Sequence, residues 1–347
     1  MSQTRKYLTL GLGHGINDCI AGFIVGSLFY HNYSSLELGI YTLIYNLIAF
    51  GGQLAFAKIL ETIFMPKKYL IGAFLLLVAS LGFLNFSPKL AILFSGIASA
   101  VIHVTGGVES IRKDGKAFGI GIFASPGVVG LIVGGYLAYK RIDFILPAIG
   151  MCLSYLILLM ISYKPSPNYL KPEIEEPLVE RHDVLMIILL TAISLRSFIW
   201  DVFQMVKQEN YNWLIVVAIA AMFGKLIGSF LADKIGHVKY SIIALCLSLP
   251  FLTILKKNIV TLGIGVSLLQ STIPATTAML VKLMRQKPAI AVSISFGLSV
   301  FIAIVLFYTP AIQYINNNAL IFFTLLASTL LLLLFNKLSK KGRYVSK

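Results

Sequence analysis

Two ionisable residues, His14 and Asp18, stand in a long apolar segment near the start of the chain. Their spacing of four residues places both side chains on one face of a helix. A carboxylate beside an imidazole can bind and release a proton near neutral pH. The pair therefore predicts a proton-carrying site, with Asn17 beside it as a candidate for a substrate path. The alternative is a hydrogen-bonded group that only joins this helix to a neighbour.

A second polar group stands at the end of a later apolar segment and consists of His103, Glu109 and Arg112. Glu109 and Arg112 are three residues apart and can pair on one helix face, although Arg112 is close enough to the segment end to extend into water. His103 lies deeper, so we expect it to line a cavity. Transport and structural roles stay equally open for this group.

Arg196 and Asp201 form a third group. Arginine does not readily lose its charge, so Arg196 must pair with an acid or bind an anion. Asp201 is five residues on and lies off the same helix face, which leaves Asp18 or an anionic substrate as candidate partners. A structural counter-ion is an equally good interpretation. The amides of Asn46 and Gln270 are further candidates for the substrate path, although amides often only join helices.

These residues need a scaffold, and the composition indicates which kind. Of 347 residues, 58% are hydrophobic and only 12% are charged, whereas soluble domains carry about twice that charged fraction. The apolar runs are continuous and close to the length of a transmembrane helix, and they lack the alternation of barrel strands. We therefore expect an all-α integral membrane protein with twelve spans in a lipid bilayer. The expected spans are residues 7–30, 36–58, 67–86, 89–108, 116–139, 143–163, 184–206, 212–234, 238–256, 259–283, 288–309 and 314–337.

The basic residues and one polar stretch organise the spans. With the N-terminus inside, most of the 29 Lys and Arg residues fall on the cytoplasmic face, which is the usual orientation. Both termini are therefore expected in the cytoplasm. Residues 164–183, rich in proline and acid, divide the spans six and six. We predict an N-terminal six-helix bundle (1–163), a cytoplasmic linker (164–183) and a C-terminal six-helix bundle (184–347), a layout that resembles the major facilitator superfamily.

Location and partners follow from smaller features. The first apolar segment lacks a small-residue cleavage site, so we expect a retained span in a cytoplasmic membrane. The net charge of +15 falls in loops, where it orients helices rather than binding nucleic acid. Cys19, Cys152 and Cys246 have no metal-binding spacing, and we predict no metal and no cofactor. A monomer is expected.

The loop at residues 229–239 resembles the major facilitator signature Gly-x-Leu-Ala-Asp-Arg-x-Gly-Arg-Arg. The resemblance implies that Asp233, Lys234 and Gly236 form a latch for one conformation, in which the carboxylate engages basic groups of a neighbour. We add Glu109 and Arg112 to this latch. The counterpart at residues 52–58 has a phenylalanine where the acid should be, so that copy of the latch is degenerate.

A stretch with proline and glycine is expected to act as a gating bend. Pro126 frees a backbone carbonyl, and Gly127 and Gly130 allow bending and close helix contact. Ordinary close packing explains the glycines nearly as well.

Within the superfamily, the first half resembles the fosmidomycin-resistance type of drug/proton antiporters. Residues 13–18 match its His-x-x-Asn-Asp pattern, and residues 40–47 and 195–198 are similar to its second and seventh helices. Glu109 and Arg112 keep part of its fourth-helix pattern, in which His103 stands one turn early. The resemblance implies efflux in exchange for protons.

The sequence thus predicts a proton-coupled secondary transporter that moves a small solute by alternating access. Asp18 and His14 would carry the proton, while Arg196 and His103 would tune it or bind an anionic group. Efflux by antiport is the first hypothesis, a nutrient or metabolite importer the second, and a non-transporting membrane scaffold or sensor the third. Motifs of intramembrane or ATP-driven enzymes are absent from the sequence, so no enzyme is expected.

Overall fold

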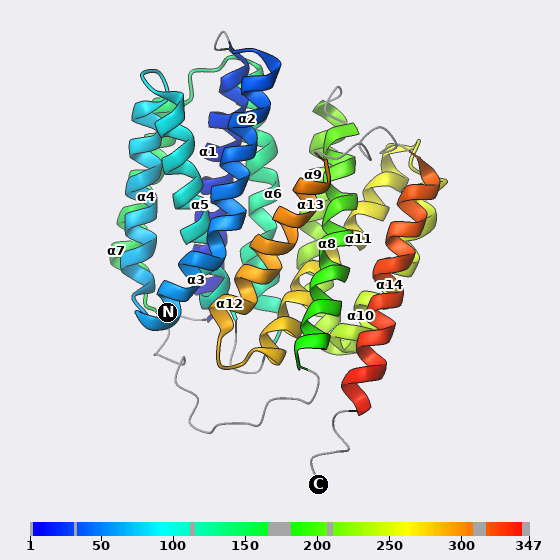
Figure 1. Ribbon diagram of the computed structural model, residues 1–347. Coiled ribbons are helices and arrows are strands. Elements are labelled where there is room, and N and C mark those ends of the chain that lie inside the picture. The colour runs from blue at the N-terminus through cyan, green and yellow to red at the C-terminus, as the bar shows by residue number, and fades with distance from the viewer. Residues whose placement is uncertain are drawn as a thin grey trace.

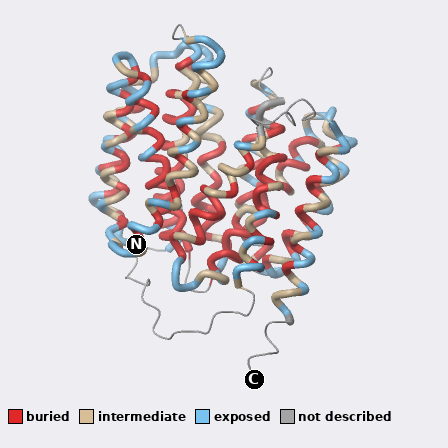
Figure 2. The backbone as a smooth tube through the Cα atoms, viewed as in Figure 1, coloured by how far each residue is buried: buried red, intermediate tan, exposed pale blue. Residues whose placement is uncertain are grey.

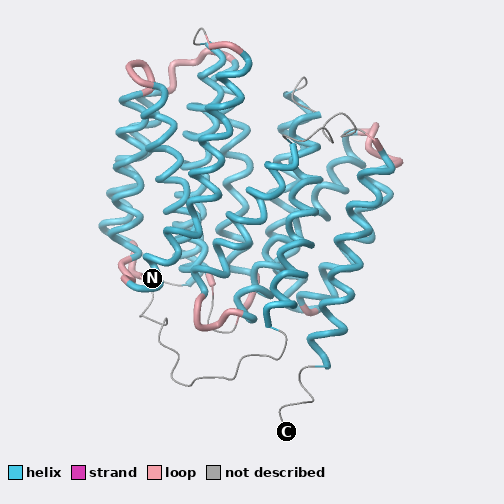
Figure 3. Tube along the Cα trace, in the orientation of Figure 1, coloured by secondary structure: helices cyan, strands magenta, loops and turns pink. Residues whose placement is uncertain are grey.

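The computed structural model of the chain describes residues 3–30, 33–111, 115–165, 182–206, 211–307 and 317–341. Within these ranges every regular element is helical (Figure 3). Eleven helices are long and apolar enough to cross a membrane, and a shorter apolar helix covers His237–Thr253. These segments match the twelve predicted spans, and the all-α membrane fold is confirmed.

We call residues 3–165 the first half and residues 182–341 the second half. The helices of the first half are α1 (Gln3–Ser27), with a 3-10 turn at Leu28–Tyr30, α2 (Ser35–Asn46), the π-helical turn η2 (Leu47–Gly51), α3 (Gly52–Thr62), α4 (Pro66–Phe83), α5 (Pro88–Ser110), α6 (Phe118–Tyr139) and α7 (Ile145–Ser162). The helices of the second half are α8 (His182–Val206), α9 (Tyr211–Ile235), α10 (His237–Thr253), α11 (Ile259–Leu283), α12 (Pro288–Ser293), the π-helical turn η3 (Ile294–Leu298), α13 (Ser299–Phe307) and α14 (Asn318–Lys341).

The two halves stand side by side and meet along several helix pairs. Two of these pairs are α6 with α9 and α3 with α12. The first helix begins and the last helix ends on the same face of the molecule (Figure 1). Most of the predicted linker falls at residues 166–181, outside the described residues.

The surface of the bundle is apolar where lipid would contact it. Large side chains such as Leu146, Ile161 and Phe323 are mostly exposed, while the buried residues lie mainly inside the bundle (Figure 2). Exposing such an apolar surface is unfavourable in water but not in the hydrocarbon of a membrane. The chain is therefore a multi-pass membrane protein.

Helices α1 and α6 approach each other closely enough to require glycine. A Cβ atom at Gly130 would overlap with the carbonyl oxygen of Gly15, and one at Gly134 with that of Cys19. Small residues let membrane helices pack backbone to backbone, and α6 runs as one helix through Pro126. Gly130, predicted as part of a gating bend, thus lies in the packed contact between α1 and α6.

The second and eleventh spans each contain a π-helical turn, and these two turns touch. A Cβ at Gly297 of η3 would come close to the carbonyl oxygen of Phe50 in η2. Such turns are rare and often occur at functional sites. Hydrophobic periodicity did not predict them, because both stretches are largely apolar and show no distinct pattern.

Candidate functional site

A cavity of about 530 Å³ lies between the two halves. Both halves and both π-helical turns contribute to its wall. It is lined by His14, Asp18, Thr42, Asn46, Phe50, His103, Ala124, Val128, Leu131, Arg196, Ser197, Trp200, Asp201, Lys225, Gln270, Ile273, Ser295, Phe296, Val300 and Ile304. All but one of the residues predicted for the proton site and the substrate path are in this wall, although they come from five different helices.

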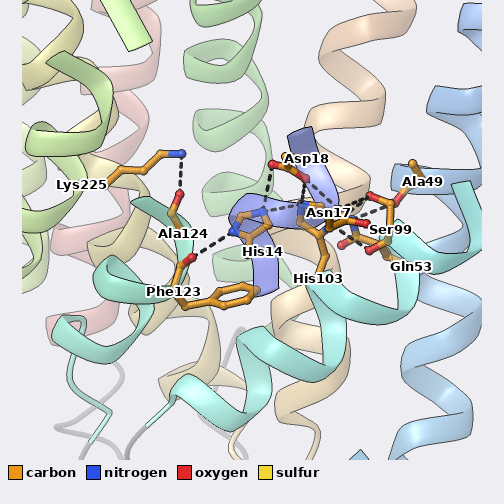
Figure 4. A network of polar contacts seen from close by, with 10 residues as sticks. All are labelled: His14, Asn17, Asp18, Ala49, Gln53, Ser99, His103, Phe123, Ala124 and Lys225. Carbon is orange, nitrogen blue, oxygen red and sulfur yellow. Dashed lines mark hydrogen bonds and ion pairs between the residues drawn. The ribbon is translucent and has the colours of Figure 1, made fainter. Parts of the chain in front are cut away.

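On the first-half side, His14 and Asp18 of α1 meet His103 of α5; we call these three residues the histidine cluster. His14 Nε2 lies 3.1 Å from Asp18 Oδ2 and 3.0 Å from His103 Nε2. His103 Nε2 is 3.9 Å from Asp18 Oδ1. The predicted pair on α1 is therefore present, and His103 is its third member (Figure 4).

Backbone carbonyls fix the orientation of both imidazole rings. His14 Nδ1 lies 2.9 Å from the carbonyl oxygen of Phe123, and His103 Nδ1 lies 2.8 Å from that of Ser99. A carbonyl only accepts hydrogen bonds, so each Nδ1 carries a hydrogen, and the facing Nε2 atoms are acceptors when the rings are neutral. Two facing acceptors repel, whereas one proton between them makes a hydrogen bond that Asp18 stabilises. The geometry of the cluster can therefore accommodate one proton between the two rings.

Within the described ranges, the same three residues form a group that could hold a metal ion. Their ligand atoms all lie within 4.8 Å of one another, and imidazole with carboxylate is a common donor set for transition metals. A proton satisfies the same geometry with no further ligands.

Asn17 lies behind the histidine cluster and outside the cavity wall. Its side chain is fully buried and donates to Asp18 Oδ1 at 2.8 Å and to Ser99 Oγ at 3.3 Å. Asn17 was predicted as part of the substrate path, but it is not among the lining residues of this cavity, and its hydrogen bond orients the Asp18 carboxylate. Gly127 of α6 makes room for the cluster, since a Cβ there would overlap with Asp18 and His14.

On the second-half side, Arg196 and Asp201 of α8 line the cavity with Lys225 of α9; we call these three residues the arginine group. Arg196 is 3% exposed, and its Nη2 donates to Ser197 Oγ at 3.2 Å. Among the described residues, Arg196 Nε, Arg196 Nη1 and Asp201 Oδ2 have no hydrogen-bond partner. Neither expected acid pairs with Arg196 within the described residues: Asp18 is held by His14, and Asp201 forms no ion pair with it.

Lys225 was not selected from the sequence, although it is a cation within an apolar span. It is 9% exposed, and its Nζ donates to the carbonyl oxygen of Ala124 on α6 at 3.1 Å. That bond uses one of three ammonium donors. Its position inside a span was the signal that could have identified it, because such residues usually face a cavity.

At the face that carries the termini, Asp233 joins the halves. Its Oδ1 accepts from the backbone nitrogen of Ala117 at 2.7 Å, and its Oδ2 accepts from that of Phe118 at 3.0 Å. A carboxylate at the N-terminus of α6 also interacts with the helix dipole. His237 Nε2 lies 2.9 Å from Asp233 Oδ1 and orients the carboxylate. Across the two halves the predicted acid therefore contacts backbone amides, and its basic neighbour His237 belongs to its own half.

The other residues of the signature have different surroundings. Gly236 has a φ of 100° and makes the sharp turn between α9 and α10, a conformation that favours glycine. Lys234 is exposed, and its Nζ lies 4.2 Å from the centre of the Phe230 ring.

The matching contact on the other helix pair comes from Glu61, which was not predicted. Its Oε1 accepts from the backbone nitrogens of Ala289 at 2.6 Å and Ile290 at 3.3 Å, at the start of α12. Glu61 stands five residues after the phenylalanine that replaces the signature acid. The expectation of a degenerate first copy was therefore incomplete, because an acid one turn later makes an equivalent contact between the halves.

Glu109, predicted as part of the latch, makes contacts within the first half. It forms an ion pair with Lys6 of α1 and accepts from the hydroxyl of Tyr163 at 2.6 Å. Arg112, its predicted partner, lies outside the described residues.

Comparison with known proteins identifies the fold but no family. Neither a family model nor a curated protein matches the sequence. Among solved structures, the outward conformation of the transporter FucP superposes with a TM-score of 0.72 at 10% identity and covers 98% of each chain. A variant of the E. coli fucose:proton symporter FucP gives 0.67 at 11% identity, with 97% of this chain and 96% of that chain covered. The human organic anion transporter TETRAN gives 0.71 at 13% identity, with 98% and 100% covered. The chain has the fold of the major facilitator superfamily.

Proposed function

We propose that this chain, with the fold of the major facilitator transporters, is a proton-coupled secondary transporter of a small solute. The observation that carries the proposal is the cavity of about 530 Å³, which is lined by ionisable residues of both halves. Its size falls in the range of small-molecule sites. A membrane scaffold would have no need for buried charges, since apolar residues of similar size serve packing at no cost.

Alternating access would be a movement of the two halves, residues 1–163 and 184–347, about this cavity. Two carboxylate contacts, Asp233 with α6 and Glu61 with α12, support a state that is closed at the face of the termini. Their release would let that face open. The bias of basic residues supports placing this face in the cytoplasm, in a cytoplasmic membrane.

The coupling proton would bind at the histidine cluster. In the protonated state, a hydrogen on His14 Nε2 is shared with Asp18 at 3.1 Å and His103 at 3.0 Å. In the deprotonated state, the two facing Nε2 atoms repel and Asp18 loses its counter-charge. Proton binding and release thus change the forces between α1 and α5, and the carbonyl of Phe123 extends this effect to α6.

The direction of transport divides two candidates. The resemblance of residues 13–18 to drug/proton antiporters favours efflux. The likeness in fold to a fucose:proton symporter supports proton-driven uptake as the second candidate.

Proton flux in proteoliposomes tests both candidates. Vesicles with an entrapped pH-sensitive dye would be exposed to a panel of sugars, amines and organic acids. A coupled carrier makes proton flux depend on a solute, and the sign of the flux separates symport from antiport. A protein that gives no solute-dependent flux for any class, although it is folded and correctly inserted, would contradict the proposal.

A further inference from the structure

The arginine group contains hydrogen-bond donors and an acceptor that have no partner among the described residues. Arg196 is 3% exposed, yet two of its three nitrogens have no partner among the described residues. A buried cation without an acceptor is costly unless a ligand supplies one. Each bidentate edge of the guanidinium pairs Nη2 with Nε or with Nη1, and Nη2 has a second hydrogen beyond the one it gives to Ser197. A carboxylate or phosphate can therefore bind across Nη2 and one of the two unpartnered nitrogens.

A second cation and an acid stand around the same space. Lys225 Nζ has donors to spare after its one bond to Ala124, and Asp201 Oδ2 is a buried acceptor without a partner in the described part of the chain. Arg196 and Asp201 line one cavity but form no ion pair. A molecule between them would satisfy both if it carried an anionic group at one end and a hydrogen-bond donor at the other.

The rest of the cavity wall limits the body of that molecule. Trp200, Phe50, Phe296 and Val300 are apolar or aromatic and belong to the same cavity wall as the charged residues. Asp18 also lines the cavity, but each of its oxygens already has a partner, His14 or Asn17. Around the arginine group, the charge of the wall comes from two cations and one acid.

We propose that the cavity binds a small organic acid whose anionic group, a carboxylate, phosphonate or phosphate, lies against Arg196 and Lys225, and whose amine or hydroxyl group donates to Asp201. This inference rests on the proposed function, because it names the substrate class of the same site. The histidine cluster then handles the proton and the arginine group handles the solute.

Matched probes of similar size test this substrate class by binding alone. The set is 3-phenylpropionate, phenylalanine, phenylphosphonate, the neutral 3-phenylpropanol and the cationic 2-phenylethylamine. Fluorescence of Trp200 reports binding in a Trp213→Phe background, because these are the two tryptophans of the chain. We expect the acids to bind at least about tenfold more tightly than the alcohol and the amine. Comparing the affinities of the carboxylates and the phosphonate shows which kind of anionic group the site prefers.

Variants assign the effect to the arginine group. Arg196→Gln should weaken binding of the acids by about tenfold to a hundredfold, and Arg196→Lys should fall between the two because it keeps charge but loses the planar fork. Lys225→Gln should weaken it less. Lys239→Gln makes the same charge change at an exposed site and should leave binding unchanged. Asp201→Asn should reduce the preference for phenylalanine over 3-phenylpropionate.

The outcomes separate this inference from the proposed function. If the alcohol or the amine binds as well as the acids, or if Arg196→Gln leaves the affinity for acids unchanged, the substrate class is wrong. If only neutral or cationic solutes produce solute-dependent proton flux, the proposed substrate class is wrong, but the proposed transport function is supported. Binding of acids that depends on Arg196, without any solute-dependent flux, would sustain the site and overturn the transport.

Discussion

The two polar groups in the cavity differ in how their atoms are satisfied. In the histidine cluster, every titratable atom of His14, Asp18 and His103 faces another member of the cluster, a backbone carbonyl or Asn17. In the arginine group, Arg196 and Asp201 keep buried atoms without any partner in the described residues. Both groups are equally unusual in an apolar span, so burial alone does not distinguish them.

The difference indicates two kinds of task. A closed network can gain or lose a proton with little rearrangement, because its heavy atoms are already in place. An open group is incomplete without a ligand, and its stability depends on what enters the cavity. Under the proposed function, this difference places coupling in the first half and recognition in the second half.

The largest effect is expected from removal of the carboxylate of the histidine cluster. Asp18→Asn should abolish solute-dependent proton flux in proteoliposomes, because the neutral amide cannot stabilise a proton between the two imidazoles. Binding of 3-phenylpropionate should change by less than about threefold, since Asp18 does not contact the arginine group within the described residues. Asp143→Asn, at an exposed position, provides the matched control. Coupled flux that persists in Asp18→Asn would remove the histidine cluster from the mechanism.

Stability without ligand should respond with opposite signs in the two groups. His14→Ala should destabilise the protein by about 2–4 kcal/mol, because it opens a cavity and leaves His103 and Asp18 without their partner. Arg196→Met should stabilise it by about 1–3 kcal/mol, because it replaces a buried, unpaired cation with an apolar side chain of similar length. Thermal unfolding in detergent measures both. Destabilisation by Arg196→Met would show that the guanidinium has a structural partner.

The two carboxylate contacts between the halves should make unequal contributions. Asp233→Asn weakens two backbone hydrogen bonds and the bond to His237, whereas Glu61→Gln weakens two bonds made by one oxygen. At about 1 kcal/mol per charged helix-end contact, Asp233→Asn should raise access to the cavity from the face of the termini about fivefold, and Glu61→Gln should raise it less. Labelling of Val300→Cys by an impermeant thiol reagent, in a Cys246→Ser background, reports that access. Equal labelling of wild type and both variants would mean that these contacts do not hold the closed state.

The sequence predicted the scaffold well, and the site only where the signal was local. The apolar runs were sufficient to predict the spans, because a helix satisfies all backbone hydrogen bonds of a segment inside a membrane. The spacing of His14 and Asp18 was sufficient to place them together. The contact with His103 depends on how α1 and α5 pack, and the sequence does not encode that contact in any short pattern.

What the sequence analysis missed has a physical reason in each case. Glu61 has a role because the start of α12 lies beside it, and a pattern search for an acid at residue 56 could not find it. Arg196 was expected to need a partner, but the partnerless atoms of Arg196 and Asp201 are visible only in three dimensions. Asn17 was assigned to the substrate path because it neighbours Asp18, although successive helix residues face different directions.

The smallest effect is expected at Lys234, where the signature and the structure disagree most about a residue's task. The signature predicts a basic residue next to the acid of the latch. In the structure, the ammonium of Lys234 lies 4.2 Å from the centre of the Phe230 ring, and such an exposed cation–π contact contributes about 0.5–1 kcal/mol. Asp233 takes its hydrogen bonds from backbone amides and His237 instead. Lys234→Gln should therefore change labelling of Val300→Cys by less than about twofold, and a change as large as that of Asp233→Asn would show that the lysine acts on the carboxylate in another state of the transport cycle.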